Sequence, residues 1–235
     1  MALISNLEDP QDYSKALVVL MPALNEVLTI GRVVQEVRTV VGSEVVVIDD
    51  ASTDGTAEAA REAGATVLPL TLRLGAWGAI RTGVCYAFKH GYQVAVTMDA
   101  DGQHIADSIQ SVVAPIESNR ADVVIGSCIH RGGLARKSAW FFFRGLTRLG
   151  VNDLTSGLRA YNRAGISALM SSETTLFDYQ DIGVLLYLKK TGLRIAEAPV
   201  SMCSRISGHS RVFSSWWAVL QYLLVSGVLC LSRIK

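Results

Sequence analysis

The sequence has few features of a zinc site, a disulfide framework or a nucleic-acid-binding surface. Its four cysteines, Cys85, Cys128, Cys203 and Cys230, are widely scattered, and no C-x-x-C spacing occurs, so neither a zinc site nor a disulfide framework is indicated. The formal net charge is +1, which predicts no nucleic-acid partner. The N-terminus through Tyr13 is polar and acidic and has no apolar signal-peptide core, which predicts a reduced, cytoplasmic location.

Two glycine-rich phosphate-binding patterns are also missing. A Rossmann dehydrogenase needs G-x-G-x-x-G directly after its first strand, but the first turn here is Pro22-Ala23-Leu24-Asn25-Glu26. The absence of G-x-x-x-x-G-K-[ST] argues against a P-loop enzyme. A phosphatase of the haloacid-dehalogenase type also uses D-x-D, but normally after its first strand, whereas the D-x-D here follows the fourth predicted strand.

Apolar segments alternate between strand and helix patterns along most of the chain. We predict strands at 16–21, 44–48, 66–70, 93–98, 122–126 and 194–199, and helices at 26–41, 77–90, 106–118, 139–149 and 181–191. The stretch 52–56 has turn and N-cap residues, which open a further helix through residue 63. Pro115 is expected to end or kink its helix. This alternation predicts an α/β domain with a mostly parallel sheet and helices on both faces.

The stretch 94–104 is the most informative one. An apolar run reaches Met98 and is followed by Asp99, Ala100, Asp101, Gly102, Gln103 and His104. Side chains two apart in an extended chain point the same way, so the two carboxylates are expected to converge just beyond the strand end. Paired hard oxygen ligands at that place suit Mg²⁺ or Mn²⁺ on a diphosphate, whereas a polar turn with a helix cap is the plainer alternative. His104 and His209 are expected to be polar loop residues.

Polar clusters also follow the first two predicted strands. Asn25 and Glu26 follow the first, and Asp49 and Asp50 end the second. Three such clusters at the carboxyl ends of parallel strands favour a ligand with a base, a ribose and a metal-bound diphosphate. A nucleotide sugar has all three groups. Adjacent strand residues face opposite ways, so we expect only one of the two aspartates to reach the nucleotide, and we predict Asp50.

The chain resembles glycosyltransferase family 2, the inverting enzymes of the GT-A fold, over about residues 16–212. The matching motifs are residues 22–26, residues 47–56, residues 98–104 and the segment Asp153-Leu154-Thr155-Ser156-Gly157-Leu158-Arg159. Within the family it is most similar to the polyprenyl-phosphate sugar synthases, whose Arg-x-x-Gly-x-Ser-[Lys/Arg] element corresponds to residues 205–211.

This resemblance implies a role for individual residues. Pro22, Ala23, Asn25, Glu26 and Gly75 would lie in the donor site, and Asp50 with Asp49 would contact the base. Asp99 would hold the ribose and approach the metal, which Asp101 and Gln103 would ligate. Arg205 and Arg211 would face phosphate groups, and Asp101, Asp181 and Arg205 would be the catalytic residues. The implied reaction is one in-line displacement at the anomeric carbon, in which the metal stabilises the departing nucleoside diphosphate.

Two departures from the branch bear on the acceptor. Its members usually have Gly-Ser-Arg after the fifth strand, where the arginine grips the acceptor phosphate, but Cys128 stands here, so Arg131 or Arg136 is the candidate replacement. Many members also have lysine where Ala76-Trp77 stands. Asp178 and Asp181 lie where the family places its acceptor-side acidic motif. A general base there would suit a saccharide hydroxyl, which needs deprotonation, rather than a lipid phosphate.

The C-terminal segment differs from the rest of the chain. Residues 216–231 are almost entirely apolar, with Trp216 and Trp217 at one end and Arg233 and Lys235 beyond the other. A helix of about 17 residues here would span about 26 Å, slightly short of a hydrocarbon core of about 30 Å. We therefore divide the chain into a catalytic domain at 1–214 and a membrane-associated helix at 215–235, with a soluble core helix as the alternative.

These features together predict a peripheral or monotopic enzyme at the inner face of the cell membrane. Its partners would be a nucleotide-diphosphate sugar and a lipid-linked or saccharide acceptor, with a homo-oligomer possible. The alternative from another class is a non-catalytic nucleotide-sugar-binding regulator of a membrane glycan-assembly complex.

Overall fold

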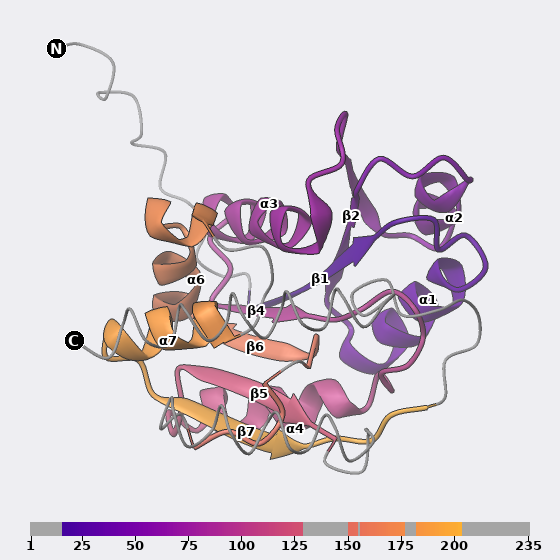
Figure 1. The fold of residues 1–235 in the computed structure, drawn as a ribbon. Helices are drawn as coiled ribbons and strands as arrows, with labels where there is room; N and C mark the ends of the chain where they lie inside the picture. The colour runs from indigo at the N-terminus through magenta and orange to yellow at the C-terminus, as the bar shows by residue number, and fades with distance from the viewer. Residues whose placement is uncertain (1–15, 129–149, 155, 177–181, 204–235) are drawn as a thin grey trace, which may run out of the picture.

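The computed structural model describes residues 16–128, 150–154, 156–176 and 182–203. Within them, one sheet has the strand order β3-β2-β1-β4-β6-β5-β7 (Figure 1). The strands are β1 (Leu17–Ala23), β2 (Glu44–Asp49), β3 (Thr66–Pro69), β4 (Val94–Thr97), β5 (Val123–Ser127), β6 (Arg159–Asn162) and β7 (Ile195–Pro199). All neighbouring strands are parallel except β6, which is antiparallel to both β4 and β5.

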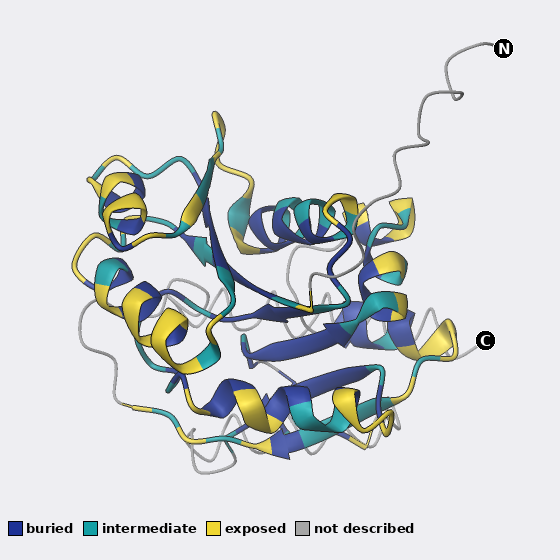
Figure 2. Ribbon diagram, turned by 180° about the vertical axis from the view of Figure 1, so that it is seen from behind, coloured by how far each residue is buried: buried dark blue, intermediate teal, exposed yellow. Residues whose placement is uncertain are grey.

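Helices cover both faces of this sheet, as the alternation predicted. They are α1 (Ile30–Val41), α2 (Thr56–Glu62), α3 (Gly75–Lys89), α4 (Ser108–Glu117), α6 (Arg163–Leu169) and α7 (Ile182–Lys190), with a 3-10 helix η1 (Ser172–Leu176). Helices α1, α2 and α4 pack on one face, and α3, α6 and α7 pack on the other. Figure 2 shows the result: buried strands lie between helices whose outward faces carry the exposed residues.

The apolar runs of the central strands follow from this two-sided coverage. In β1, Val19 and Met21 belong to the core beside α1 and α4, whereas Val18 and Leu20 belong to the core beside α3. A strand that is covered on both faces has no polar side, so its sequence is continuously apolar rather than alternating. The carboxyl ends of β1, β2 and β4 are thereby held rigidly side by side.

The structure corrects the sequence prediction at several points. Strand β6 and helix α6 were not predicted, and neither was η1. Strand β6 is short and begins with an arginine, Arg159, although that arginine is fully buried. A signal for α6 was present, because the side chain of Asn162 caps this helix by accepting a hydrogen bond from the backbone N–H of Gly165.

Helix ends also differ from the prediction. The first helix begins at Ile30 rather than Glu26, and it is preceded by a turn in which the carbonyl of Glu26 accepts from the N–H groups of Thr29 and Ile30. Pro115 does not end α4, which continues to Glu117. The predicted helix at 139–149 and the segment 215–235 lie outside the described residues, so the division of the chain at 214/215 stays a prediction.

Hydrogen bonds to Asp122 link the ends of β5, β6 and β7. Its carboxylate accepts hydrogen bonds from the guanidinium and backbone N–H of Arg194, before β7, and from Asn162 at the end of β6. The hydrogen bonds from Arg194 hold the pKa of Asp122 at about 2, below the ordinary 3.8. The ionised form therefore stabilises the fold above the ordinary pKa.

We predict that Asp122→Asn lowers the free energy of unfolding by about 1 kcal/mol at neutral pH, a value discounted because Arg194 is half exposed. Because the folded-state pKa is the lower one, this difference from the wild-type chain should shrink as the pH falls from about 4 toward 2. Urea unfolding across that range measures it. A difference that stays constant with pH would contradict the assigned contact.

Candidate functional site

The three predicted polar clusters lie on adjacent strands. Strand β1 stands between β2 and β4, so the segments that follow Ala23, Asp49 and Thr97 emerge next to one another at the carboxyl edge (Figure 1). Ala23 pairs with Asp49, and the backbone N–H of Asp50 donates to the carbonyl of Ala23 over 2.8 Å. The chain leaves β1 toward β2 on one side and reaches β4 on the other, which is the switch point where open α/β sheets bind ligands.

The loops after β1 and β2 are hydrogen-bonded to each other. The side-chain oxygen of Asn25 accepts from the backbone N–H of Thr53 (2.8 Å), and the N–H of Asn25 donates to Ser52 Oγ (2.9 Å). The N–H of Glu26 donates to Thr56 Oγ1 over 2.8 Å. Asn25 has φ of 50°, a left-handed conformation that asparagine tolerates better than most residues. Asn25 and Glu26 thus fix the loops, while Pro22 and Ala23 lie within β1 itself.

Asp49 and Asp50 are both buried and have different partners. Asp50 accepts hydrogen bonds from the backbone N–H groups of Leu74 (2.6 Å) and Gly75 (2.9 Å) at the start of α3. Asp49 accepts from the N–H of Ser52 (3.2 Å) and lines a hollow of about 390 Å³ formed with the loop 52–58, Arg61 and Pro69. Asp50 therefore anchors the start of α3 at Leu74 and Gly75, and its contact with a base stays a prediction.

The D-x-D segment leaves the sheet earlier than predicted. Strand β4 ends at Thr97, and the chain turns at Ala100 and Asp101. The alternation of side chains in an extended chain therefore does not continue to Asp101, and that reason for convergence was wrong. The turn is held instead by hydrogen bonds: Asp101 Oδ1 accepts from the N–H of Gln103 (3.0 Å), and Thr29 Oγ1 donates to the carbonyl of Ala100 (3.0 Å).

Two residues that were not predicted as site residues lie against Asp99. The Cα of Gly157 faces its carboxylate so closely that no Cβ would fit between them. His104 Nε2 lies 3.6 Å from Asp99 Oδ2, and the His104 side chain is fully buried. His104 lies in the segment between β4 and α4, as expected of a loop residue, but its side chain is buried. The D-x-D motif predicted the region of the site, but its spacing gave no signal that Gly157 contacts Asp99.

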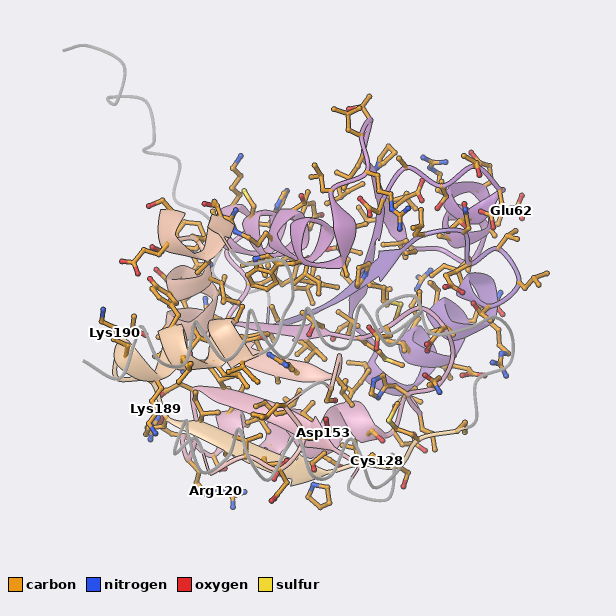
Figure 3. The ribbon with its side chains drawn as sticks, viewed as in Figure 1. Glu62, Arg120, Cys128, Asp153, Lys189 and Lys190 are labelled. Atoms are coloured by element: carbon orange, nitrogen blue, oxygen red, sulfur yellow. The ribbon has the colours of Figure 1, made fainter. Side chains whose placement is uncertain are left out.

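Hydrogen bonds between side chains and backbone groups hold residues 152–154 and 156–159. The Arg159 guanidinium is buried and donates to the carbonyls of Ser156 and Leu154, each over 2.9 Å. Glu197 on β7 accepts from the N–H groups of Asn152 and Asp153. In Figure 3 the labelled Asp153 and Cys128 lie in the half of the view that contains β5 and β7. These contacts fix the stretch that carries Gly157.

The structure describes both positions at which the chain departs from the lipid-phosphate branch. Trp77, which stands in the region where many members have lysine, is buried, and its Nε1 donates to the carbonyl of Thr174 over 2.8 Å. Ser127 ends β5 in the core, and Cys128, which follows it, is half buried. Six predicted site residues lie outside the described part of the chain: Arg131, Arg136, Asp178, Asp181, Arg205 and Arg211.

The donor atoms at the carboxyl edge fit a divalent cation shared with a diphosphate. Over the described residues, no group of three or more His, Cys, Asp or Glu side chains has the geometry of a metal site. Mg²⁺ characteristically takes one or two carboxylates and completes its shell with substrate phosphates and water. Asp99 and Asp101, with the Gln103 amide, supply a donor set of that kind, so the residues present fit such an ion.

The model of the family described as "Glycosyl transferase family 2" matches residues 18–165, from β1 into α6. The chain belongs to glycosyl transferase family 2. The match includes all three polar clusters and Arg159, which confirms the resemblance seen in the motifs.

Three named relatives are similar to this chain over most of their own length. An undecaprenyl-phosphate mannosyltransferase of Micrococcus luteus is 32% identical over 214 residues, which cover 82% of this chain and 86% of that protein. A polyprenol monophosphomannose synthase of Mycolicibacterium smegmatis is 28% identical over 231 residues, with 88% and 86% covered. A UDP-N-acetylglucosamine–dolichyl-phosphate N-acetylglucosaminyltransferase of Methanococcus voltae is 28% identical, with 79% and 85% covered.

A solved structure shows the same fold. Glucosyl-3-phosphoglycerate synthase of Mycobacterium tuberculosis, in complex with Mn²⁺, UDP-glucose and phosphoglyceric acid, superposes with a TM-score of 0.72 at 21% sequence identity. The similarity covers 94% of this chain and 80% of that one. The fold of this chain is therefore GT-A-like, as the motifs implied.

Proposed function

We propose that this chain transfers a sugar from a nucleoside diphosphate sugar to a polyprenyl phosphate, with Mg²⁺ or Mn²⁺ bound at the diphosphate. The observation that carries the proposal is the convergence of three polar clusters at the switch point of the sheet, after β2, β1 and β4. Relatives named for polyprenyl, undecaprenyl and dolichyl phosphates support the acceptor. The structural neighbour that binds Mn²⁺ with UDP-glucose supports the metal and the donor.

In this proposal the residues at the carboxyl edge bind different parts of the donor. Asp50, with Asp49 beside it, contacts the base, and Asp99 holds the ribose. Asp99, Asp101 and Gln103 hold the cation, which stabilises the negative charge that develops on the departing nucleoside diphosphate. The hydrogen-bonded loops around Asn25 and Glu26 keep the carboxyl ends of β1 and β2 in a fixed arrangement, so that donor groups are oriented before the reaction.

On the acceptor side we propose that the cations Arg205 and Arg211 face phosphate groups and that Arg131 or Arg136 takes the place of the arginine that Cys128 replaces. Guanidinium groups bind phosphate through paired hydrogen bonds, which offset charge and fix orientation. A phosphate acceptor is already anionic and attacks without a general base. If Asp181 acts as a base with Asp178 beside it, a saccharide hydroxyl would be the favoured acceptor instead.

A panel of nucleoside diphosphates tests the donor site. We expect one of UDP and GDP, with Mn²⁺, to raise the unfolding temperature of the chain, because a ligand that binds only the folded state stabilises it by mass action. The shift should disappear in excess chelator and should be absent with Mn²⁺ alone. A chain whose unfolding temperature is indifferent to every nucleoside diphosphate with Mn²⁺ would contradict a nucleotide-sugar function.

We further propose that residues 215–235 hold the enzyme at the inner face of the cell membrane, near its lipid-linked acceptor. Among the described residues, no helix is long and apolar enough to cross a bilayer. The proposal therefore rests on the sequence of 216–231, which has tryptophans at one end and cations beyond the other. Cations at 205 and 211 near the headgroups would draw an anionic lipid phosphate.

Truncation distinguishes this membrane role from a core helix. We predict that removal of residues 215–235 releases the protein from liposomes in flotation, leaves nucleoside diphosphate binding intact, spares donor hydrolysis and depresses transfer to a lipid acceptor. The full-length chain is the control, and its association state can be measured in the same preparation. A truncated protein that is insoluble or unfolded would favour a core helix, and so would a full-length protein that ignores liposomes.

A further inference from the structure

The Asp99 carboxylate occupies the space that a side chain at position 157 would fill. A Cβ built on Gly157 would lie 2.6 Å from Cγ of Asp99 and closer still to both carboxylate oxygens. Gly157 is itself tied to β4, because Thr97 Oγ1 donates to its carbonyl over 3.0 Å. The glycine is thus fixed in place, and the carboxylate rests directly on it.

His104 lies against the same carboxylate, but its ring nitrogens make no hydrogen bond within the described part of the chain. Its side chain is fully buried, and its Nε2 lies 3.6 Å from Asp99 Oδ2, a few tenths of an ångström beyond a hydrogen bond. In the described structure, neither ring nitrogen of His104 has a hydrogen-bond partner. Buried polar atoms in folded proteins are nearly always paired, so this exception calls for an explanation.

The backbone holds His104 beside the Asp99 carboxylate. His104 forms an isolated antiparallel bridge with Met202, and the carbonyl of Gln103 accepts from the N–H of Cys203 over 2.8 Å. The side chain of Asp99, by contrast, is 45% exposed. A small rotation of the carboxylate toward His104 is the movement that would satisfy the buried imidazole.

From these contacts we propose that Gly157 and His104 form a seat for the Asp99 carboxylate and are positioning residues of the donor site. Gly157 supplies the space, and Nε2–H of His104 donates to Oδ2 when cation and nucleotide are bound. The seat selects the rotamer of Asp99 and restricts its rotation, as partners of metal-binding carboxylates generally do. This inference rests on the proposed function, because Asp99 acts there on the ribose and the metal.

Gly157→Ala tests the seat without disturbing the fold. The new methyl group meets the far end of a flexible side chain, so the carboxylate is displaced and the backbone is not. We expect Mn²⁺ to support UDP or GDP binding at least about tenfold less well, with the unfolding temperature of the unliganded protein unchanged. Gly31→Ala is the matched control, because its Cβ would come no nearer than 3.7 Å to another residue, at the carbonyl of Ala59.

Two outcomes of that experiment would overturn the inference. One is an Mn²⁺ dependence in Gly157→Ala equal to that of Gly31→Ala. The other is a loss of nucleotide binding in Gly157→Ala that is the same with and without Mn²⁺. If the wild-type chain itself shows no Mn²⁺-dependent binding of any nucleoside diphosphate, the proposed function fails first, and the positioning of a metal site fails with it.

Variants of His104 test the second half of the seat. His104→Gln places an amide N–H where Nε2 lies, whereas His104→Leu fills the space without a donor. We expect Gln to retain most of the Mn²⁺-dependent binding and Leu to lose about tenfold. Equal losses in both would overturn the hydrogen bond.

A spectroscopic measurement reads the contact itself and does not depend on activity. The imidazole resonances of His104 should move in Gly157→Ala and stay in place in Gly31→Ala. Unmoved resonances in Gly157→Ala would overturn the seat, and this result separates a failure of the seat from a failure of the proposed function. It also applies if both His104 variants fail to fold.

Discussion

Asp101→Asn should reduce sugar transfer by at least about 10²-fold, the range observed when one charge-stabilising group is removed from an active site. The substitution keeps the shape of the side chain and removes a charged metal ligand. The amide oxygen of asparagine can still accept the hydrogen bond that Gln103 N–H donates to Asp101, so the turn should persist. Initial rates of transfer at saturating donor and Mn²⁺ measure the effect.

Asp107→Asn is the matched control for this prediction. Asp107 is an exposed aspartate six positions along the same segment, and its side chain makes no capping hydrogen bond to α4. Its variant should transfer sugar at the wild-type rate. Near wild-type turnover of Asp101→Asn, or full activity of the wild-type chain in excess chelator, would refute the metal role of Asp101.

Asp50→Ala should weaken nucleoside diphosphate binding by roughly 1.5–3 kcal/mol, the magnitude of a hydrogen bond to a charged group. This is a loss of about 10- to 150-fold in Kd. The structure adds a second consequence, because the N–H groups of Leu74 and Gly75 lose their carboxylate acceptor. Since these groups lie at the N-terminus of α3, the free energy of unfolding should also fall by about 1 kcal/mol. Calorimetry with UDP and GDP gives the binding loss, and urea unfolding gives the stability loss.

The two roles of Asp50 are separable by comparison with Asp49→Ala. Asp49 ends β2 and its side chain accepts from the N–H of Ser52, whereas the contacts with the start of α3 are made by Asp50. If Asp50 contacts the base, Asp50→Ala should lose far more affinity than Asp49→Ala. Unchanged binding by a folded Asp50→Ala protein would show that this carboxylate serves only the start of α3. A larger loss in Asp49→Ala would assign the base contact to Asp49.

The sequence was sufficient to predict the parallel part of the fold because burial on both faces leaves a strong local signal. Strands β1, β2 and β4 are apolar runs ended by polar residues, and the helices between them have the expected period. Strand β6 was missed because it starts with Arg159, whose burial depends on carbonyls of the preceding turn. Antiparallel insertion of such a strand is a tertiary effect without a local pattern.

The motifs predicted where the site lies but not the contacts within it. The positions of the clusters after β1, β2 and β4 follow from the order of elements, so the common edge was predicted correctly. The contacts made there were not predictable, because they join residues that are distant in the chain. Gly157 lies 58 positions beyond Asp99, and Leu74 lies 24 beyond Asp50. A carboxylate that accepts two backbone N–H groups looks the same in sequence as one that awaits a ligand.

The most direct measurement of the central claim is the formation of a glycosylated polyprenyl phosphate. Purified full-length protein is incubated with radiolabelled UDP- and GDP-sugars, Mn²⁺ and undecaprenyl phosphate in detergent, and the lipid product is separated by chromatography. We predict that one donor labels the lipid, that chelator abolishes labelling, and that Asp101→Asn labels it at least about 10²-fold more slowly. Labelling of added saccharides without labelling of the lipid, or binding of the donor with no transfer at all, would contradict the account.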